Sequence, residues 1–194
     1  MQYVADQGYP VPAVSAVSDD GTEVTMQRVS GRSLMDQFGA EPWKLPTFAR
    51  LLSELHDQLH AISAPAWLRA SPGTVGTATL HLDLHPLNIL MGAAGPVVID
   101  WSNAARGAPS TDVALTWLLV ATATIPARGA ELLLLRTGRR LFLGRFLAHA
   151  ADNEARHELA AVTAWKLADP HMSATEHAAM RALAARYSPR PPSE

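Results

Sequence analysis

The sequence has no cysteine among its 194 residues, which excludes disulfide bonds and thiolate metal sites. Lys and Arg never form a run and the formal net charge is -2, so nothing suggests binding to nucleic acid or to an anionic membrane. No apolar run reaches the roughly 18 residues of a membrane span. The start, MQYVADQGYPVPAV, lacks the basic flank and apolar core of a signal peptide. We therefore expect a cytoplasmic protein with small-molecule or protein partners.

Lysine is also scarce. Of the 16 basic residues only Lys44 and Lys166 are lysines, and the rest are arginines. Against these absences, 48% of the residues are hydrophobic and 18% are charged. A chain of this length and composition can bury one core, or one core and a small additional lobe.

The pattern of elements predicts an α+β fold. Two β-rich runs flank Asp19-Asp20-Gly21 and favour a hairpin from about Val11 to Val29, followed by a polar connector with a short helix, SGRSLMDQFG. Apolar residues at helical spacing predict a helix over about 46–62. Further helices are expected over about 110–124, 129–150, 153–168 and 173–187. We expect three parts: a β remnant at 1–30, a mainly helical part at 31–188 and a disordered tail at 189–194.

The segment HLDLHPLNILMGAAGPVVIDW, residues 81–101, places polar side chains around two apolar runs. If NILM and PVVID pair across the GAAG turn, Asn88 and Asp100 are expected side by side at the open end of a hairpin. Asp83 lies five residues before Asn88, on a loop that Pro86 stiffens, and can reach the same place. The apolar pairs expected in this register are Met91 with Pro96, Leu90 with Val97 and Ile89 with Val98.

These polar groups suit phosphoryl transfer. A carboxylate and an amide oxygen at neighbouring positions are hard ligands of the kind Mg²⁺ prefers, and Mg²⁺ completes its shell with water and phosphates. The remaining carboxylate, that of Asp83, can accept a proton from a hydroxyl. A metal that neutralises phosphate charge and a base that orients the attacking oxygen are what the reaction requires.

The pattern His81-x-Asp83-x-x-x-x-Asn88, followed by Ile99-Asp100-Trp101, resembles the catalytic loop and metal-binding segment of the protein-kinase-like superfamily. The form is that of the aminoglycoside/choline phosphotransferase family. The resemblance implies a kinase-like fold with a truncated β N-lobe, a mainly helical C-lobe and a central β-hairpin. It also implies ATP-dependent transfer of the γ-phosphoryl group to the hydroxyl of a small molecule, with GTP as the alternative nucleotide.

The same resemblance assigns roles to individual residues. It implies that Asp83 is the catalytic base, that Asn88 and Asp100 hold Mg²⁺, and that His81 packs behind the loop as a structural residue. Asp112, in STDVALTW, resembles the structural Asp that opens a helix and ties down the loop, and Ser110 or Thr111 could cap that helix. Only twelve positions separate Asp100 from Asp112, too few for the long activation segment of a regulated protein kinase.

The resemblance extends upstream to a hinge at Gln27-Arg28-Val29, where the carbonyl of Gln27 and the amide of Val29 would bind the adenine edge. The family's glycine-containing nucleotide loop and phosphate-binding Lys strand have no counterpart here, and no lysine precedes Lys44. An internal start, a fragment and a degenerate member are the three explanations. The first two strands would then expose an apolar edge through which a homodimer could form.

The same residues allow other interpretations of the function and of the metal ligands. A catalytically impaired protein that acts by binding is the alternative to an active kinase. His81, Asp83 and His85 could instead hold the metal of a hydrolase. His56 and His60 have a spacing compatible with zinc, but no third ligand is obvious, and a packed or solvated pair is the simpler interpretation. Acidic residues on the C-terminal helices could attract a cationic acceptor or form a solvated face; these are Asp152, Glu154, Glu158, Asp169 and Glu176.

Overall fold

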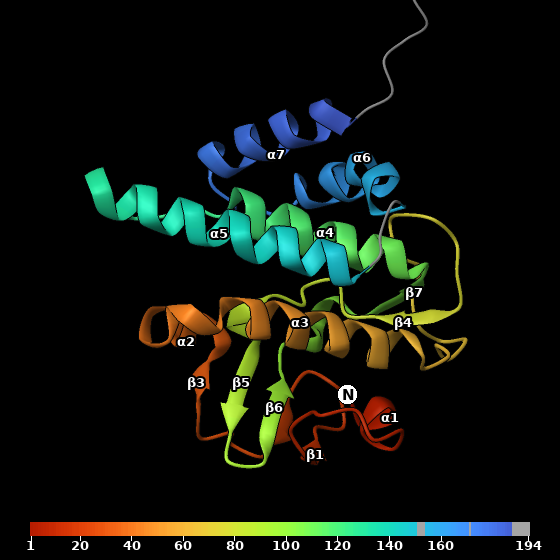
Figure 1. Ribbon diagram of the computed structural model, residues 1–194. Helices are drawn as coiled ribbons and strands as arrows, with labels where there is room; N and C mark the ends of the chain where they lie inside the picture. Colours follow the sequence, from red (N-terminus) through yellow and green to blue (C-terminus); the bar gives the residue numbers. More distant parts are fainter. Residues whose placement is uncertain (151–153, 171, 188–194) are drawn as a thin grey trace, which may run out of the picture.

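The computed structural model describes residues 1–150, 154–170 and 172–187 and has an α+β fold (Figure 1). The predicted tail at 189–194 lies outside the described residues. The helices are α1 Gln2–Ala5, α2 Leu34–Ala40, α3 Leu45–His60, α4 Pro109–Thr122, α5 Gly129–His149, α6 Ala155–Lys166 and α7 Ala174–Tyr187. The strands are β1 Val14–Val17, β2 Val24–Met26, β3 Arg32–Ser33, β4 Ala78–Leu80, β5 Ile89–Gly92, β6 Gly95–Val98 and β7 Ala105–Gly107. Single 3₁₀ turns lie at Pro42–Lys44, Pro86–Asn88 and Trp101–Asn103.

The N-terminal ribbon, β1 paired antiparallel with β2, confirms the predicted hairpin with shorter strands. Gly21 takes a positive φ of 71° in its turn, and the Asp20 carboxylate accepts hydrogen bonds from Ser18 and Thr22. The hydrogen bond from Ser18 is the main reason that the pKa of Asp20 falls to about 2. The ribbon contributes little to the core, since none of its strand residues is buried.

The central sheet is the hairpin of β5 and β6, extended on one side by β3. Its ladder pairs Met91 with Pro96, Leu90 with Val97 and Ile89 with Val98, which confirms the predicted register. Strand β3 was not predicted, since the connector around it reads as polar. Gly31 lies so close to the backbone of Met91 that a Cβ there would stand 2.3 Å from the Met91 carbonyl oxygen.

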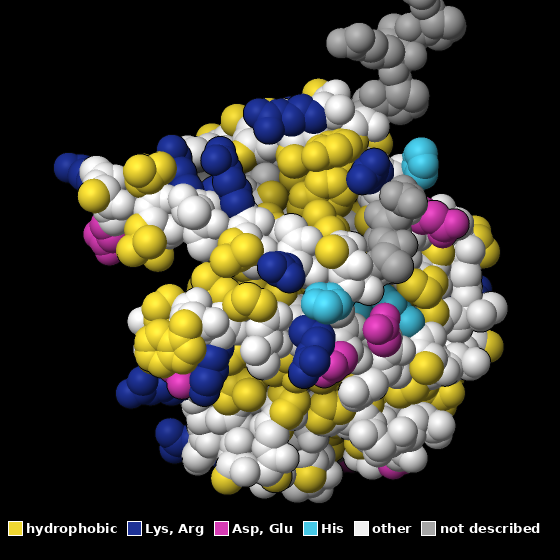
Figure 2. Space-filling model, in the orientation of Figure 1, with side chains coloured by type: hydrophobic (Ala, Val, Ile, Leu, Met, Phe, Trp, Pro, Cys, Tyr) yellow, Lys and Arg dark blue, Asp and Glu magenta, His cyan; other side chains and the backbone are white. Residues whose placement is uncertain are grey.

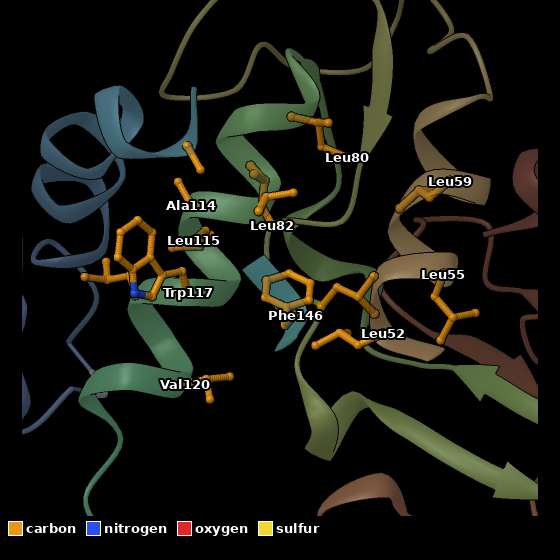
Figure 3. Packing of buried hydrophobic residues seen from close by; sticks show 14 of the residues in the cluster. Leu52, Leu55, Leu59, Leu80, Leu82, Ala114, Leu115, Trp117, Val120 and Phe146 are labelled. Carbon is orange, nitrogen blue, oxygen red and sulfur yellow. The ribbon is translucent and has the colours of Figure 1, made fainter. Parts of the chain in front are cut away.

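The core lies between α3, α4 and α5. Helix α3, predicted at 46–62, buries Leu52, Leu55 and Leu59, which recur at helical spacing along one face. Figure 3 shows Phe146 of α5 between these leucines and the apolar side chains of α4. Helix α4 is buried around most of its circumference, because α3, α5, α6 and α7 all pack against it. In Figure 1 the helices α4 to α7 lie on one side of α3, and the central hairpin lies on the other.

The predicted C-terminal helices are confirmed, with ends shifted by one or two residues. The predicted cap of α4 by Ser110 or Thr111 is wrong, because the helix begins at Pro109, after Ala108, and both hydroxyl residues lie inside it. Proline needs no partner for a backbone N–H at this position. A short antiparallel pair, β4 with β7, also went unpredicted and carries the chain into the loop that follows Leu80. Within the described residues, no helix is both long enough and apolar enough to cross a membrane.

Candidate functional site

The predicted catalytic loop begins with a backbone turn that a buried carboxylate holds in place. Leu82 has a positive φ of 57°, which is uncommon for a leucine. Its amide donates to Asp112 Oδ1 at 2.8 Å, and the amide of His81 donates to Asp112 Oδ2 at 2.9 Å. Asp112 lies in the first turn of α4, so this helix positions the start of the loop directly. The two hydrogen bonds offset the cost of the left-handed turn.

Asp112 is fully buried, and this decides what it can do. Burial alone would raise the pKa of the Asp112 carboxyl, but hydrogen bonds from His60 and His81 and the nearby histidine rings hold the pKa well below its usual range. The carboxylate is therefore charged at neutral pH. It acts on the loop through backbone hydrogen bonds, as a positioning residue.

His81 lies behind the loop. Its ring is fully buried, with Nε2 3.0 Å from the carbonyl oxygen of Ile99 and the ring edge packed on Trp101. Burial lowers the pKa of His81, so the imidazole is neutral at neutral pH. A neutral ring whose Nε2 carries the proton donates to Ile99, and this hydrogen bond ties the loop to the end of β6.

Asp83 lies at the rim of the loop, with 15% of its side chain exposed. The amide nitrogen of Asn88 donates to the Asp83 carbonyl at 2.9 Å and to Asp83 Oδ2 at 3.3 Å. His85 Nε2 lies 3.5 Å from Asp83 Oδ1. Burial lowers the pKa of His85, although the charge of Asp83 opposes this, so the neighbour of Asp83 is a neutral imidazole at neutral pH.

Asp100 lies one position beyond the residue opposite Asn88 in the ladder, and the expectation that the two side chains lie side by side at the open end stays a prediction. The amide of Ile99 donates to the Asn88 carbonyl at 3.0 Å, so Ile99 is the residue opposite Asn88. Asp100 follows with φ 62° and ψ 69°, which takes the chain out of the ladder. Its carboxylate is exposed and accepts a hydrogen bond from Ser102 Oγ at 2.7 Å. Asp83 and Asp100 both lie near enough to His85 to affect its pKa.

The donor atoms at this place fit a hard divalent cation. Because the Asn88 amide nitrogen is used within the loop, its oxygen is directed away from Asp83. The Asp100 carboxylate stands at the surface beside the same hairpin end. One amide oxygen and one or two carboxylates, with space for water and phosphate oxygens, match the ligand preferences of Mg²⁺.

The predicted hinge residues lie along the chain that leads to β3, near the tip of the central hairpin and not at its open end, where Asn88 and Asp100 lie. The Gln27 amide donates to the Ala13 carbonyl at 2.8 Å, which extends the β1–β2 ribbon by one residue. Gln27 also lines a cavity of about 370 Å³ together with residues of the first 14 positions. Val29 lies against Gly92, where an added Cβ would stand 3.6 Å from Val29 Cγ1. The hinge segment is thus close to the tip of the central hairpin.

The alternative metal site of His81, Asp83 and His85 does not hold, because among residues 1–150, 154–170 and 172–187 only one cluster has metal-ligand geometry. That cluster contains His56, His60 and Asp112, so the third ligand that the sequence did not reveal is Asp112. Only the fold brings position 112 to the end of α3. The prediction that this histidine pair is packed is confirmed for His56, which is 1% exposed.

The acidic residues of the C-terminal helices mostly have partners within the protein. Glu158 is buried and accepts from the amide and hydroxyl of Thr74 and from Thr111. Asp169 pairs with Lys166 at 2.9 Å, and Glu176 accepts hydrogen bonds from Ser173 that lower its pKa. Asp152 lies outside the described residues. Among the others, only Glu154 remains a simple exposed acid, so the predicted acidic face does not form.

Lys166 is the group near the site that the sequence did not indicate. It is 7% exposed and lies over the ring of Trp165 at 5.9 Å. Its charge contributes to lowering the pKa of His85, after burial, which is the main cause. A lone lysine on an amphipathic helix gives no signal in the sequence that would distinguish it from a solvated charge.

Comparison with solved structures defines the fold class. The chain is similar to an aminoglycoside-3'-phosphotransferase of type VIII (TM-score 0.57, 18% identity, 96% of this chain and 77% of that chain). It is also similar to aminoglycoside phosphotransferase APH(4)-Ia (TM-score 0.57, 15% identity, 93% of this chain and 78% of that chain). A thermostable mutant of the latter was solved in a ternary complex with AMP-PNP and hygromycin B. Its TM-score is 0.57 at 16% identity, and the match covers 92% of this chain and 76% of that chain. These likenesses establish a protein-kinase-like fold.

The family follows from the sequence itself. Residues 43–147 match the phosphotransferase enzyme family known as APH, and this range contains the whole loop and hairpin. The chain belongs to that family. A comparison with curated proteins finds no match.

Proposed function

We propose that the protein is an ATP-dependent phosphotransferase that moves the γ-phosphoryl group to a hydroxyl of a small molecule. The observation that carries the proposal is the junction of Asp83 and Asn88 within one loop, which Asp112 anchors from below. Membership of the phosphotransferase family supports the reaction class. A kinase-like site needs a base and a metal-binding pair at this place, and the chain supplies both kinds of group.

In the proposed reaction, Asp83 Oδ1 or Oδ2 accepts the hydrogen bond of the acceptor hydroxyl and orients its oxygen toward the γ-phosphorus. The new O–P bond forms while the bond from phosphorus to the β–γ bridging oxygen breaks, ADP leaves, and the hydroxyl proton passes to Asp83. Asn88 fixes the Asp83 carboxylate through its amide nitrogen. Mg²⁺, held by Asn88 and Asp100, would neutralise charge on the phosphates. The carbonyl of Gln27 and the amide of Val29 are the proposed adenine contacts.

The acceptor is proposed only as a small molecule with a free hydroxyl. The similar structures are named for aminoglycosides, and one contains hygromycin B. A polycationic acceptor would favour free carboxylates around the site, but Glu158, Asp169 and Glu176 are engaged within the protein. We therefore do not propose an antibiotic as the acceptor of this chain.

A second candidate, a catalytically impaired protein that acts by binding, is favoured by one observation. Both lysines have acidic partners, Lys44 with Glu41 at 2.7 Å and Lys166 with Asp169 at 2.9 Å. Neither stands ready to bind the transferring phosphoryl group. Positioning and charge supply nearly all the catalysis in phosphoryl transfer, so this difference bears directly on rate.

Single-turnover transfer distinguishes the two candidates. The chain, in excess over ATP labelled in the γ-phosphate, is incubated with Mg²⁺ and a panel of hydroxyl acceptors, and labelled product is separated. The active-kinase proposal predicts acceptor-dependent product that Asp83→Asn abolishes while Mg²⁺–nucleotide binding persists. Binding without product in the unaltered chain would favour the second candidate, and product formed equally by Asp83→Asn would overturn the role of Asp83.

A further inference from the structure

The strongest feature outside the proposed active site is a buried cluster at the contact of α3 and α4. His56 and His60 lie one helical turn apart on α3, with 1% and 9% of their side chains exposed, and both face Asp112, which is fully buried. His60 Nε2 lies 3.2 Å and His56 Nδ1 lies 3.8 Å from the same oxygen, Asp112 Oδ2. One ligand atom from each residue lies within 4.8 Å of the other two.

The hydrogen bonds around His56 decide which of its nitrogens carries the proton. Thr116 Oγ1 donates its only hydrogen to the Leu84 carbonyl at 2.7 Å, so toward His56 Nε2, at 3.1 Å, it can only accept. His56 Nε2 must therefore bear the hydrogen. A second proton, on Nδ1, would have no acceptor within hydrogen-bond distance, because the nearest carboxylate oxygen, Asp112 Oδ2, is 3.8 Å away, so Nδ1 carries a lone pair.

This tautomer leaves two acceptors facing each other. The lone pair of His56 Nδ1 has no hydrogen-bond partner although it is buried, and the nearest charged group is the carboxylate oxygen of Asp112. A buried lone pair beside a carboxylate is unfavourable unless a cation stands between them. The distances leave room for one, because ligands about 2.0 Å from a tetrahedral zinc lie roughly 3.3 Å from one another.

We propose that His56 Nδ1, His60 Nε2 and Asp112 Oδ2 bind a transition-metal dication of the Zn²⁺ class, which replaces the hydrogen that His60 Nε2 donates to Asp112 in the metal-free protein. Two imidazoles and a carboxylate are a ligand set that zinc uses, with water in the fourth position. Thr116 then acts behind the metal by accepting the second ring N–H of His56, an arrangement that orients metal-bound histidines. Because Asp112 also holds the amides of His81 and Leu82, the metal fastens helix α3 to the catalytic loop.

The test uses the untagged full-length chain, stripped with EDTA and titrated with Zn²⁺ against a chromophoric chelator. We expect one equivalent bound and a higher melting temperature. His56→Gln and His60→Gln should each lose the stoichiometric binding, and Thr116→Val should weaken it about 10- to 100-fold. The matched control His157→Gln, an exposed histidine of α6, and Asp100→Ala, at the proposed magnesium site, should keep it.

Every outcome bears on the proposal. Absence of stoichiometric Zn²⁺ binding in the unaltered chain overturns it without any variant, so a variant that fails to fold leaves the test intact. Binding that survives in both His56→Gln and His60→Gln, or that disappears in Asp100→Ala, also overturns it by placing the metal elsewhere. Binding lost in either histidine variant while His157→Gln and Asp100→Ala retain it supports the site.

Discussion

At the scale of single residues, Asp112 connects more of the candidate site than any residue that would touch substrate. Its two oxygens accept backbone hydrogen bonds from His81 and Leu82 and one from the side chain of His60. Water cannot easily replace Asp112 as the acceptor for these donors, since the carboxylate is fully buried. Asp83, by contrast, lies at the rim of the loop and keeps part of its side chain in solvent.

This contrast predicts different costs for two substitutions. Asp112→Ala leaves the amides of His81 and Leu82 without partners, each at about 1–3 kcal/mol, and should lower the free energy of unfolding by at least that amount. Asp83→Ala should lower the free energy of unfolding by much less than Asp112→Ala does, because the Asp83 carboxylate is partly exposed and its removal leaves fewer buried groups without partners. Urea unfolding of both variants provides the measurement. Equal midpoints would contradict the anchoring role of Asp112.

At the scale of elements, the close approach of β3 to β5 depends on Gly31. A Cβ at this position would meet the Met91 carbonyl oxygen at 2.3 Å, and backbone cannot move aside as a flexible side chain can. Gly31→Ala should therefore push β3 from the hairpin and destabilise the fold by about 1–3 kcal/mol. The free energy of unfolding, with nucleotide affinity as a second readout of hinge displacement, measures this effect.

Gly144 provides the matched control on helix α5. It is helical, and a Cβ there would meet nothing within 4 Å. Gly144→Ala should stabilise the protein by about 0.5–1 kcal/mol, because alanine loses less backbone freedom than glycine in a helix. If both substitutions shifted stability in the same direction, the close approach at Gly31 would not be the cause.

Long elements could be predicted from the sequence, whereas contacts between distant segments could not. Helix α3 has several turns over which its leucines repeat, and the β5–β6 register follows from one short turn. Strands of two or three residues, such as β3 and β4, are too short to show alternation. The confirmed register places Ile99 opposite Asn88, and Asp100 then leaves the ladder in a left-handed conformation, which the sequence does not indicate.

The site divides in the same way. Asp83, Asn88 and Asp100 lie within 18 positions of one another, so a local pattern could indicate them. The link of His60 to Asp112 spans 52 positions and depends on how α3 packs on α4. No spacing in the sequence expresses that contact, and the same holds for the burial of Glu158 against Thr74. Tertiary packing alone makes these residues partners.

At the scale of the whole molecule, the N-terminal ribbon is the surface best suited to pair with a second copy. Val17, Val24 and Met26 are 57%, 45% and 42% exposed, and β1 and β2 have no other strand beside them among the described residues. An open, apolar strand edge favours association. We predict a concentration-dependent dimer in sedimentation velocity that Val24→Lys weakens. Val75→Lys, in an exposed loop, is the control, and an equal effect of both would contradict pairing through the ribbon.

Both lysines of this chain pair with acids, Lys44 with Glu41 and Lys166 with Asp169. In Figure 2 the Lys and Arg side chains are spread over the visible face and do not gather at one place. Losing one preorganised charge commonly costs a factor of about 10² to 10³ in rate. We therefore predict that the 194-residue chain turns over far more slowly than roughly 1 s⁻¹ under steady-state conditions. Rates at or above that value would contradict this prediction.

The central claim is that the hairpin end near Asn88 and Asp100 binds a metal–nucleotide complex, and calorimetry tests it most directly. AMP-PNP is titrated into the unaltered chain and into Asp100→Ala, each with and without Mg²⁺, after melting curves show that both fold. Weak binding that requires Mg²⁺ and disappears in Asp100→Ala is the predicted result. The same Mg²⁺-dependent affinity in both proteins would contradict the metal site and the phosphotransferase activity proposed from it.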